Sequence, residues 1–212
     1  MRSSFFGSVL LGAFFSAGIL LACSSDDDAG SSGGGGGDAG VDRRLAQPFV
    51  PPNASCPVVI ESPAILESPH VPEGTVITYN SNPPSSGPHY PVWAQFQEFD
   101  KPIDHGYLVH SMEHGAVVLL YKCQSPTEAA CVQNVEALRK VRDAVKADPL
   151  CVDPVRARVI LAPDPRIDRP VAAAAWGWTY KADCVDAPTL GAFIAENYAI
   201  GPENFCSPGR TF

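Results

Sequence analysis

The sequence predicts an α+β domain: a small mixed β-sheet with two main helices, rich in loops and stabilised by disulfides. Three observations support this. Segments after Gly106 follow the order strand, helix, strand, strand, helix. The 21 prolines interrupt regular elements and favour loops. The 7 cysteines leave an even set once Cys23 is set apart, as in exported disulfide proteins. A thioredoxin-like α/β fold would share this element order, but the redox Cys-x-x-Cys motif is missing.

Residues 1–22 are predicted to be a lipoprotein signal peptide. A positive Arg2 precedes an apolar stretch, and Leu20-Leu-Ala-Cys23 has the form of a lipobox whose cysteine would carry the lipid. The alternatives are an ordinary signal peptide and an uncleaved anchor helix, because the stretch approaches the length of a bilayer span. Ser24 at the following position favours the outer membrane. We therefore expect a lipid-anchored protein of the bacterial cell envelope, with its domain in the periplasm or at the surface.

Residues 23–47 are predicted to be a flexible tether, and residues 48–212 a single globular domain. The tether is rich in Asp, Ser and Gly, and such a segment cannot bury enough apolar surface to fold. The net charge is −8, without a run of Lys or Arg, which argues against a nucleic-acid partner. The expected partner is the membrane, through the lipid on Cys23. Protein partners stay unknown.

Six cysteines remain for the folded domain, and we predict that they form three disulfides. They are Cys56, Cys123, Cys131, Cys151, Cys184 and Cys206. The sequence leaves their pairing open, although Cys123 and Cys131 bracket a strand end and a helix start, where a local bridge fits. A thiolate metal site is the alternative, and the lack of any Cys-x-x-Cys spacing argues against it.

Before Gly106 the chain predicts mostly irregular structure. Val58–Ile60 fits an edge strand between prolines, and the alternating Thr75–Tyr79 fits a second strand. Asn80–Tyr90 is a turn-rich loop that delivers His89. Pro91–Phe99 has helical spacing but is short.

After Gly106 the elements are clearer. The apolar run that ends at Tyr121 fits a buried strand. A helix follows, with Ser125 as its expected cap and an end near Ala147. Its apolar stripe consists of Val132, Val135, Leu138, Val141 and Val145. Arg158–Ala162 and Val171–Trp176 read as strands. Pro188–Tyr198 reads as the second helix, with Leu190, Phe193 and Ile194 facing inward.

The central stretch carries the candidate site, because His110, Met112, Glu113 and His114 fall within five residues. On a helix, His110, Glu113 and His114 would share a face; on a strand, His110, Met112 and His114 would. With His89, and less firmly His105, these residues predict a metal site. Imidazole with a thioether favours copper, and imidazole with a carboxylate favours zinc or another divalent ion.

Three other interpretations stay open. The same residues can form a buried hydrogen-bond network that joins the His89 loop to the central stretch. His110-Ser-Met-Glu-His114 also matches the H-x-x-E-H pattern of inverted zinc peptidases, which need a helix that continues; Gly115 and the β-branched run after it argue against one. A non-catalytic binding module could use its aromatic residues as a groove. These residues are Tyr90, Trp93, Phe96, Trp176 and Trp178.

Three blocks of sequence together resemble the bacterial family catalogued as domain of unknown function 3105, over about residues 70–205. They are Tyr79–Tyr90, Val109–Val118, and Ala174–Gly177 with Gly201–Glu203. The family signature maps onto Pro84, Ser86, Gly87, His89, His110, Glu113, His114 and Gly115. The resemblance implies no established activity, but histidines in the signature favour a shared metal or polar site. Leucine is more usual where this chain has Met112, which weakens the case for copper bound by a thioether.

Overall fold

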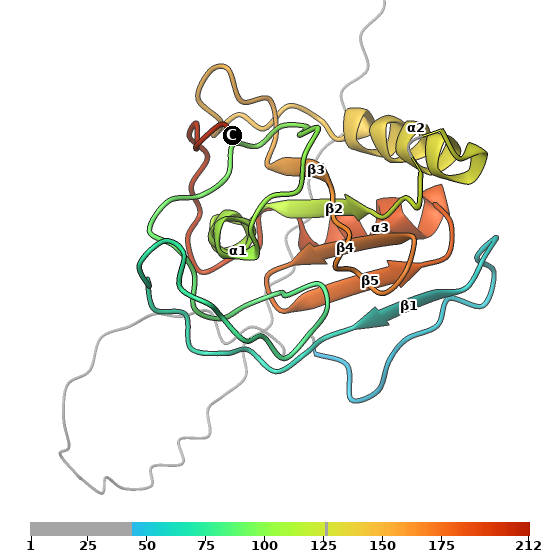
Figure 1. The fold of residues 1–212 in the computed structure, drawn as a ribbon, viewed down its shortest axis with the longest axis horizontal. Coiled ribbons are helices and arrows are strands. Elements are labelled where there is room, and N and C mark those ends of the chain that lie inside the picture. Colours follow the sequence, from blue (N-terminus) through green and yellow to red (C-terminus); the bar gives the residue numbers. More distant parts are fainter. Residues whose placement is uncertain (1–43, 126) are drawn as a thin grey trace, which may run out of the picture. The chain divides into compact units, whose positions relative to one another are not determined.

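The computed structural model describes residues 44–125 and 127–212, so the predicted signal peptide, Cys23 and most of the tether lie outside the described residues (Figure 1). The elements are β1 (Val58–Glu61), α1 (His105–Glu113), β2 (Val117–Tyr121), α2 (Ala129–Ala144), β3 (Val159–Pro163), β4 (Val171–Ala175), β5 (Trp178–Ala182) and α3 (Ala187–Asn197). In the described part of the chain, no helix is both long and apolar enough to cross a membrane.

The strands form one mixed sheet in the order β1-β5-β4-β2-β3. Strands β2 and β3 are parallel and are connected by α2, because parallel neighbours need a crossover. The other pairs are antiparallel. The predicted α+β class is confirmed. The predicted order of strand, helix, strand, strand, helix is found with one further strand, β5, before the last helix. All six described cysteines form disulfides, and none belongs to a Cys-x-x-Cys motif.

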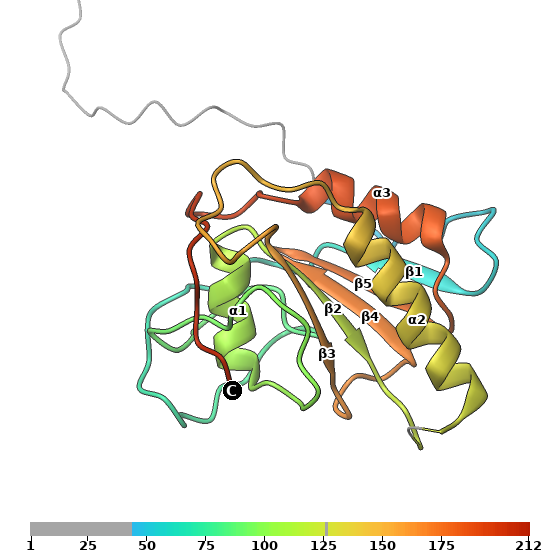
Figure 2. The same cartoon turned by 90° about the horizontal axis from the view of Figure 1, so that it is seen from above.

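Helices cover both faces of the sheet. Figure 2 shows α2 and α3 over one face and α1 on the other. Val118 and Leu120 of β2 belong to the core on the α1 side. Val117 and Leu119 belong to the core that contains Leu138 of α2. Because alternate residues of β2 are buried on opposite faces, this strand is apolar throughout.

The two main helices are confirmed as α2 and α3, but details of α2 differ from the prediction. Ser125 does not cap the helix; its hydroxyl lies 3.1 Å from that of Thr127, and the N-cap residue is Glu128. Val132 is 42% exposed instead of facing the core. Cys131 takes the inward position, because its disulfide with Cys123 fixes the rotation of the first turn.

The predicted strand at Thr75–Tyr79 and the predicted helical turn at Pro91–Phe99 are both wrong. Val76 is 94% exposed, and no strand lies beside it to form a ladder. The Pro91–Phe99 segment contains bends and no helix, and it makes single bridges from Ala94 to Arg210 and from Glu98 to Leu161. Local patterns failed in both segments because these loops are positioned by contacts with distant parts of the chain.

Strand β5 was not predicted. It pairs with β4 through a tight turn in which Ala175 is opposite Trp178. Gly177, the second residue of this turn, has φ 74°, a left-handed conformation that glycine adopts without strain. The Trp176-Gly177 dipeptide is not one of the common hairpin signals, so this turn was easy to miss.

Three disulfides are present, as predicted. They join Cys56 to Cys184, Cys123 to Cys131 and Cys151 to Cys206. The local Cys123–Cys131 bridge confirms the expected pairing. Disulfides persist in oxidising compartments, so these three bridges indicate an extracytoplasmic domain.

Candidate metal centre

Helix α1 carries several of the candidate metal-binding residues. Close contacts at its first turn fix the position of the helix. Asp104 caps the helix by accepting a hydrogen bond of 3.0 Å from the backbone N–H of Gly106. A Cβ on Gly106 would lie 2.7 Å from the Tyr90 ring, so glycine lets the His89–Tyr90 loop pack directly on the helix. The helix ends at Glu113, and Gly115 turns the chain into β2 with φ 81°.

The helical conformation decides which residues share a face. His110, Glu113 and His114 are 4%, 8% and 3% exposed and lie within about 100° of one another around the helix axis. Met112 lies about 200° around the helix from His110. Its side chain is 1% exposed and belongs to the hydrophobic core. The thioether is therefore on a different side of the helix from the histidines.

Two loops bring further histidines to this face. Val71 donates its N–H to the His89 carbonyl at 2.8 Å, and His89 donates its own to the Pro69 carbonyl at 3.2 Å. This parallel bridge holds His70 beside His89, with their ring centres 4.9 Å apart. The His70 and His110 rings stack with centres 5.0 Å apart. His70 lies in an irregular proline-rich segment, and sequence reasoning did not single it out.

Ligand atoms of His70, His89, His110 and Glu113 all lie within 4.8 Å of one another. His89, His110 and Glu113 are buried, whereas His70 is exposed. The group is therefore closed on the protein side and open to solvent beside His70. The structure brings together three of the predicted residues and adds His70.

Backbone carbonyls fix the orientation of both buried rings. Nδ1 of His89 is 3.0 Å from the Gly87 carbonyl, and Nδ1 of His110 is 2.6 Å from the Tyr90 carbonyl. A carbonyl oxygen can only accept, so each Nδ1 carries the proton and each neutral ring keeps its lone pair on Nε2. Burial lowers the pKa of His110 to about 4, and the neighbouring histidines add to this effect, so the ring is neutral at pH 7.

The contact between His89 and Glu113 is not an ordinary hydrogen bond. Nε2 of His89 lies 3.0 Å from Oε2 of Glu113, yet among the described residues this buried nitrogen has no hydrogen-bond partner. Buried nitrogens are rarely left unpaired in this way. Two ligands that each lie about 2.0–2.1 Å from a tetrahedral zinc ion are roughly 3.3 Å apart. The contact between Nε2 of His89 and Oε2 of Glu113 is short but lacks the geometry of a hydrogen bond. Such a separation is expected for two atoms that bind the same ion.

His114 lies beside this group and faces the C-terminal segment. Its Nε2 is 3.0 Å from Oε2 of Glu203, and its buried Nδ1 has no hydrogen-bond partner among the described residues. Burial lowers the pKa of His114, whereas the Glu203 carboxylate opposes that shift. Glu113, His114 and Glu203 form a second group of ligand atoms that lie within 4.8 Å of one another. Sequence reasoning did not connect Glu203 with the histidines.

His105 is not part of either group. At the start of α1 its Nε2 lies 2.6 Å from Oδ2 of Asp164, which also accepts a hydrogen bond of 2.7 Å from Arg166 through Oδ1. Burial alone would raise the pKa of Asp164, but the hydrogen bonds from His105 and Arg166 lower it to about 2. The pair joins α1 to the segment that follows β3.

Asp164 should make the domain sensitive to acid. Its folded pKa of about 2 lies below the ordinary value of 3.8, so its contribution is complete above pH 4 and is lost as the pH falls toward 2. The difference corresponds to about 2 kcal/mol. In urea titrations, Asp164→Asn should lose this stability at pH 6 and approach the wild type near pH 2. The exposed Asp100→Asn control should follow the wild type throughout, and an equal Asp164→Asn deficit at both pH values would contradict the assignment.

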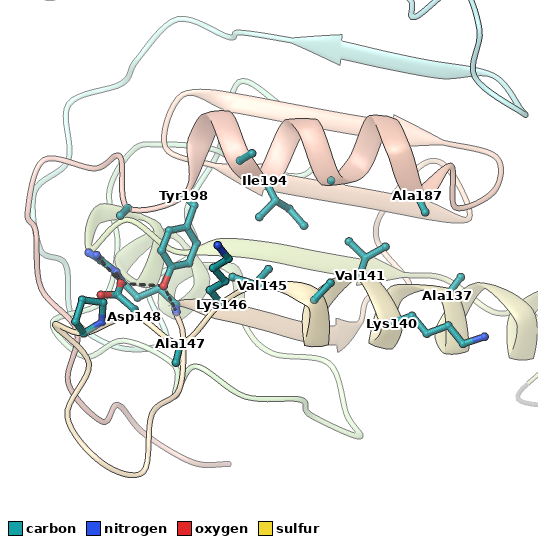
Figure 3. A pocket seen from close by; sticks show the side chains of 16 residues that line it. Ala137, Lys140, Val141, Val145, Lys146, Ala147, Asp148, Ala187, Ile194 and Tyr198 are labelled. Atoms are coloured by element: carbon teal, nitrogen blue, oxygen red, sulfur yellow. Dashed lines mark hydrogen bonds and ion pairs between the residues drawn. The ribbon is translucent and has the colours of Figure 1, made fainter.

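A separate apolar groove of about 770 Å³ runs between α2 and α3 (Figure 3). Val141 of α2, Val145 at the C-cap of α2 and Ile194 of α3 line it. At one end Tyr198 donates a hydrogen bond of 2.9 Å to Asp148. No histidine lines this groove, so its chemistry differs from that of the histidine groups on α1.

Residues 70–208 match the family model described as a protein of unknown function, DUF3105. The chain belongs to the DUF3105 family. The matched region of this DUF3105 domain contains both groups of ligand atoms, from His70 to Glu203. The resemblance identified from the three sequence blocks is confirmed. No curated protein and no solved structure matches the chain.

Proposed function

We propose that this DUF3105 domain binds a divalent transition-metal ion, zinc or copper, through His70, His89, His110 and Glu113. One observation carries the proposal. Two buried imidazoles are fixed at Nδ1 by backbone carbonyls, and their Nε2 lone pairs are left free beside a buried carboxylate. An N–H that donates to a carbonyl on the far side of the ring is the usual way in which proteins orient histidine ligands.

The competing hydrogen-bond network explains these contacts less well. A network would pair Nε2 of His89 with a donor or an acceptor, but the nearby Glu113 oxygen is misdirected for a hydrogen bond. Three imidazoles and one carboxylate form a donor set that suits tetrahedral zinc and also suits Cu²⁺. Copper bound by a thioether is not supported, because Met112 lies in the core.

A zinc peptidase mechanism also lacks support. Helix α1 ends at Glu113, so the H-x-x-E-H residues are not followed by the helix that this enzyme class needs. Its two histidines also fall into different groups, His110 with His70 and His89, and His114 with Glu203. The exposed His70 instead offers a side from which an ion can enter and leave.

We further propose that the domain is exported and held at a bacterial membrane by lipid on Cys23. The lipobox at Leu20–Cys23 supports this reading. The three disulfides independently support export, because they point to an oxidising compartment. A tethered domain of this kind would meet metal ions in the cell envelope.

The purified protein with its disulfides intact should bind Zn²⁺ or Cu²⁺, and loss of a ligand should abolish that binding. Changing residues that only orient metal ligands typically weakens affinity 10–100-fold, so His89→Ala should raise the Kd by at least about 100-fold. Glu113→Gln keeps the side-chain shape while removing its charge, and it should weaken binding similarly. Equilibrium dialysis followed by mass spectrometry of the metal measures both the stoichiometry and the Kd.

His105→Ala is the matched control, because it removes a histidine of α1 that pairs with Asp164 outside the groups. It should bind metal as the wild type does. Saturating metal should also raise the Tm of the wild type by roughly 5–10 °C at about 100 times the Kd. A folded wild type that takes up neither ion, or a folded Glu113→Gln variant with unchanged affinity, would refute the proposed function.

A further inference from the structure

We propose that the centre is dinuclear: a second divalent cation binds between Glu113, His114 and Glu203, next to the first. This inference rests on the proposed function, since the two ions would share Glu113. Ligand atoms of these three residues lie within 4.8 Å of one another, as do those of the first group.

Glu113 is placed to bridge the two ions. It belongs to both groups, and its Oε2 lies 3.0 Å from Nε2 of His89 on the side of the first group. A carboxylate has a second oxygen, which remains for a neighbouring ion. The His110 and His114 rings, one from each group, have centres 4.7 Å apart. Paired metal ions in proteins lie about 3.5–4 Å apart, and two adjacent groups that share a carboxylate fit such a spacing.

The His114 ring has an unused nitrogen in a buried position. Its side chain is 3% exposed, and Nδ1 has no hydrogen-bond partner among the described residues. The other ring nitrogen, Nε2, lies 3.0 Å from Oε2 of Glu203, a contact as short as that between His89 and Glu113, and it would bind the ion beside that oxygen, which leaves Nδ1 without a partner. The Trp93 and Phe205 rings pack edge-on against His114, with centres 4.7 and 5.1 Å away, and supply no donor to this nitrogen.

Two carboxylates and one imidazole come together here. Ligand atoms of Glu113, His114 and Glu203 lie within 4.8 Å of one another, and Glu113 and His114 are buried. A divalent cation between them would be bound by both carboxylates and by the imidazole.

The C-terminal segment is held so that Glu203 stays in place. The N–H of Glu203 donates to the Glu113 carbonyl at 3.0 Å. Arg158 donates from Nη1 to the His114 carbonyl at 3.1 Å and to the Asn204 side chain at 2.8 Å. Glu203 itself has a side chain that is 58% exposed, so the second ion would keep a side open to water.

Zinc stoichiometry tests the proposal. Wild-type protein, dialysed against excess Zn²⁺ and measured by mass spectrometry, should hold two ions per chain. Glu203→Ala should hold one ion per chain, because it removes a ligand of the second site alone. The exposed Glu67→Ala is the matched control and should retain two. With Cu²⁺ at two equivalents, the wild type should show the half-field paramagnetic resonance signal of coupled ions, and Glu203→Ala should lose it.

The outcomes separate this inference from the proposed function. One ion in the wild type, lost in Glu113→Gln but unaffected by Glu203→Ala, would leave the first site standing and overturn the second. Two ions that persist in a folded Glu203→Ala variant would also overturn it. A wild type that takes up no ion would overturn both.

Discussion

Asp148→Asn is expected to lower the free energy of unfolding by about 3–5 kcal/mol. Asp148 faces the guanidinium of Arg158, and the two side chains are 6% and 2% exposed. One oxygen of Asp148 accepts hydrogen bonds of 3.0 Å from Nε and 2.8 Å from Nη2. Asparagine keeps the size of the side chain but removes its charge, so a buried cation would lose its counter-charge.

Urea unfolding with the disulfides intact measures this effect. Asp143→Asn is the matched control, because Asp143 pairs with Arg142 at 2.9 Å while 62% exposed, and an exposed pair contributes less than about 1 kcal/mol. The double variant Asp148→Leu, Arg158→Met should recover much of the loss, since it removes both buried charges together. A deficit of Asp148→Asn below about 1 kcal/mol would show that water reaches the guanidinium.

The same ion pair also contacts the segments that carry the proposed second site. Arg158 lies in the link before β3, and its Nη1 contacts the His114 carbonyl and the Asn204 side chain. Asp148 binds Nε and Nη2 of the guanidinium. Nη1 therefore stays directed at the His114 carbonyl and at Asn204, the residue after Glu203. This pair therefore connects the end of the α2–α3 groove with the second group of ligands.

Most of the sheet and its two covering helices could be predicted because their patterns are local. The β2 strand is continuously apolar since both of its faces are buried, and α2 and α3 follow helical spacing. Helix α1 could not be distinguished from a strand, because its residues are buried all round and show no periodicity. Strand β5 escaped prediction because its turn lacks a common hairpin dipeptide.

The site could be predicted only in part, because contacts between distant parts of the chain bring in some of its residues. His110, Glu113 and His114 are close in sequence, and His89 comes from a loop with a clear turn pattern. His70 reaches the centre through a single backbone bridge to His89, which no local pattern indicates. Glu203 belongs to a block that supports the family resemblance, yet contacts between distant parts of the chain, such as its backbone hydrogen bond to Glu113, place it beside the histidines.

Gly201→Ala is expected to lower the free energy of unfolding by about 1–3 kcal/mol or more, and to prevent binding of the proposed second ion. A Cβ on Gly201 would lie 2.7 Å from the backbone nitrogen of Gly115 and 2.8 Å from the Met112 carbonyl, and closer still to the carbonyl of Glu113. These are main-chain atoms at the end of α1, which cannot turn aside as a flexible side chain would. The C-terminal segment must therefore move away, and Glu203 would move with it.

Gly191→Ala is a control that should raise the free energy of unfolding instead of lowering it. This glycine lies inside α3, and an added Cβ would meet nothing within 4 Å. Alanine is the better helix former, so this variant should gain up to about 1 kcal/mol and keep two ions. Urea unfolding and zinc stoichiometry on the same samples compare the two variants. If Gly201→Ala loses stability but still holds two ions, the close approach of the C-terminal segment stabilises the fold without positioning Glu203. If it loses one ion and keeps the first, the same glycine that lets the segment pack on α1 also completes the centre.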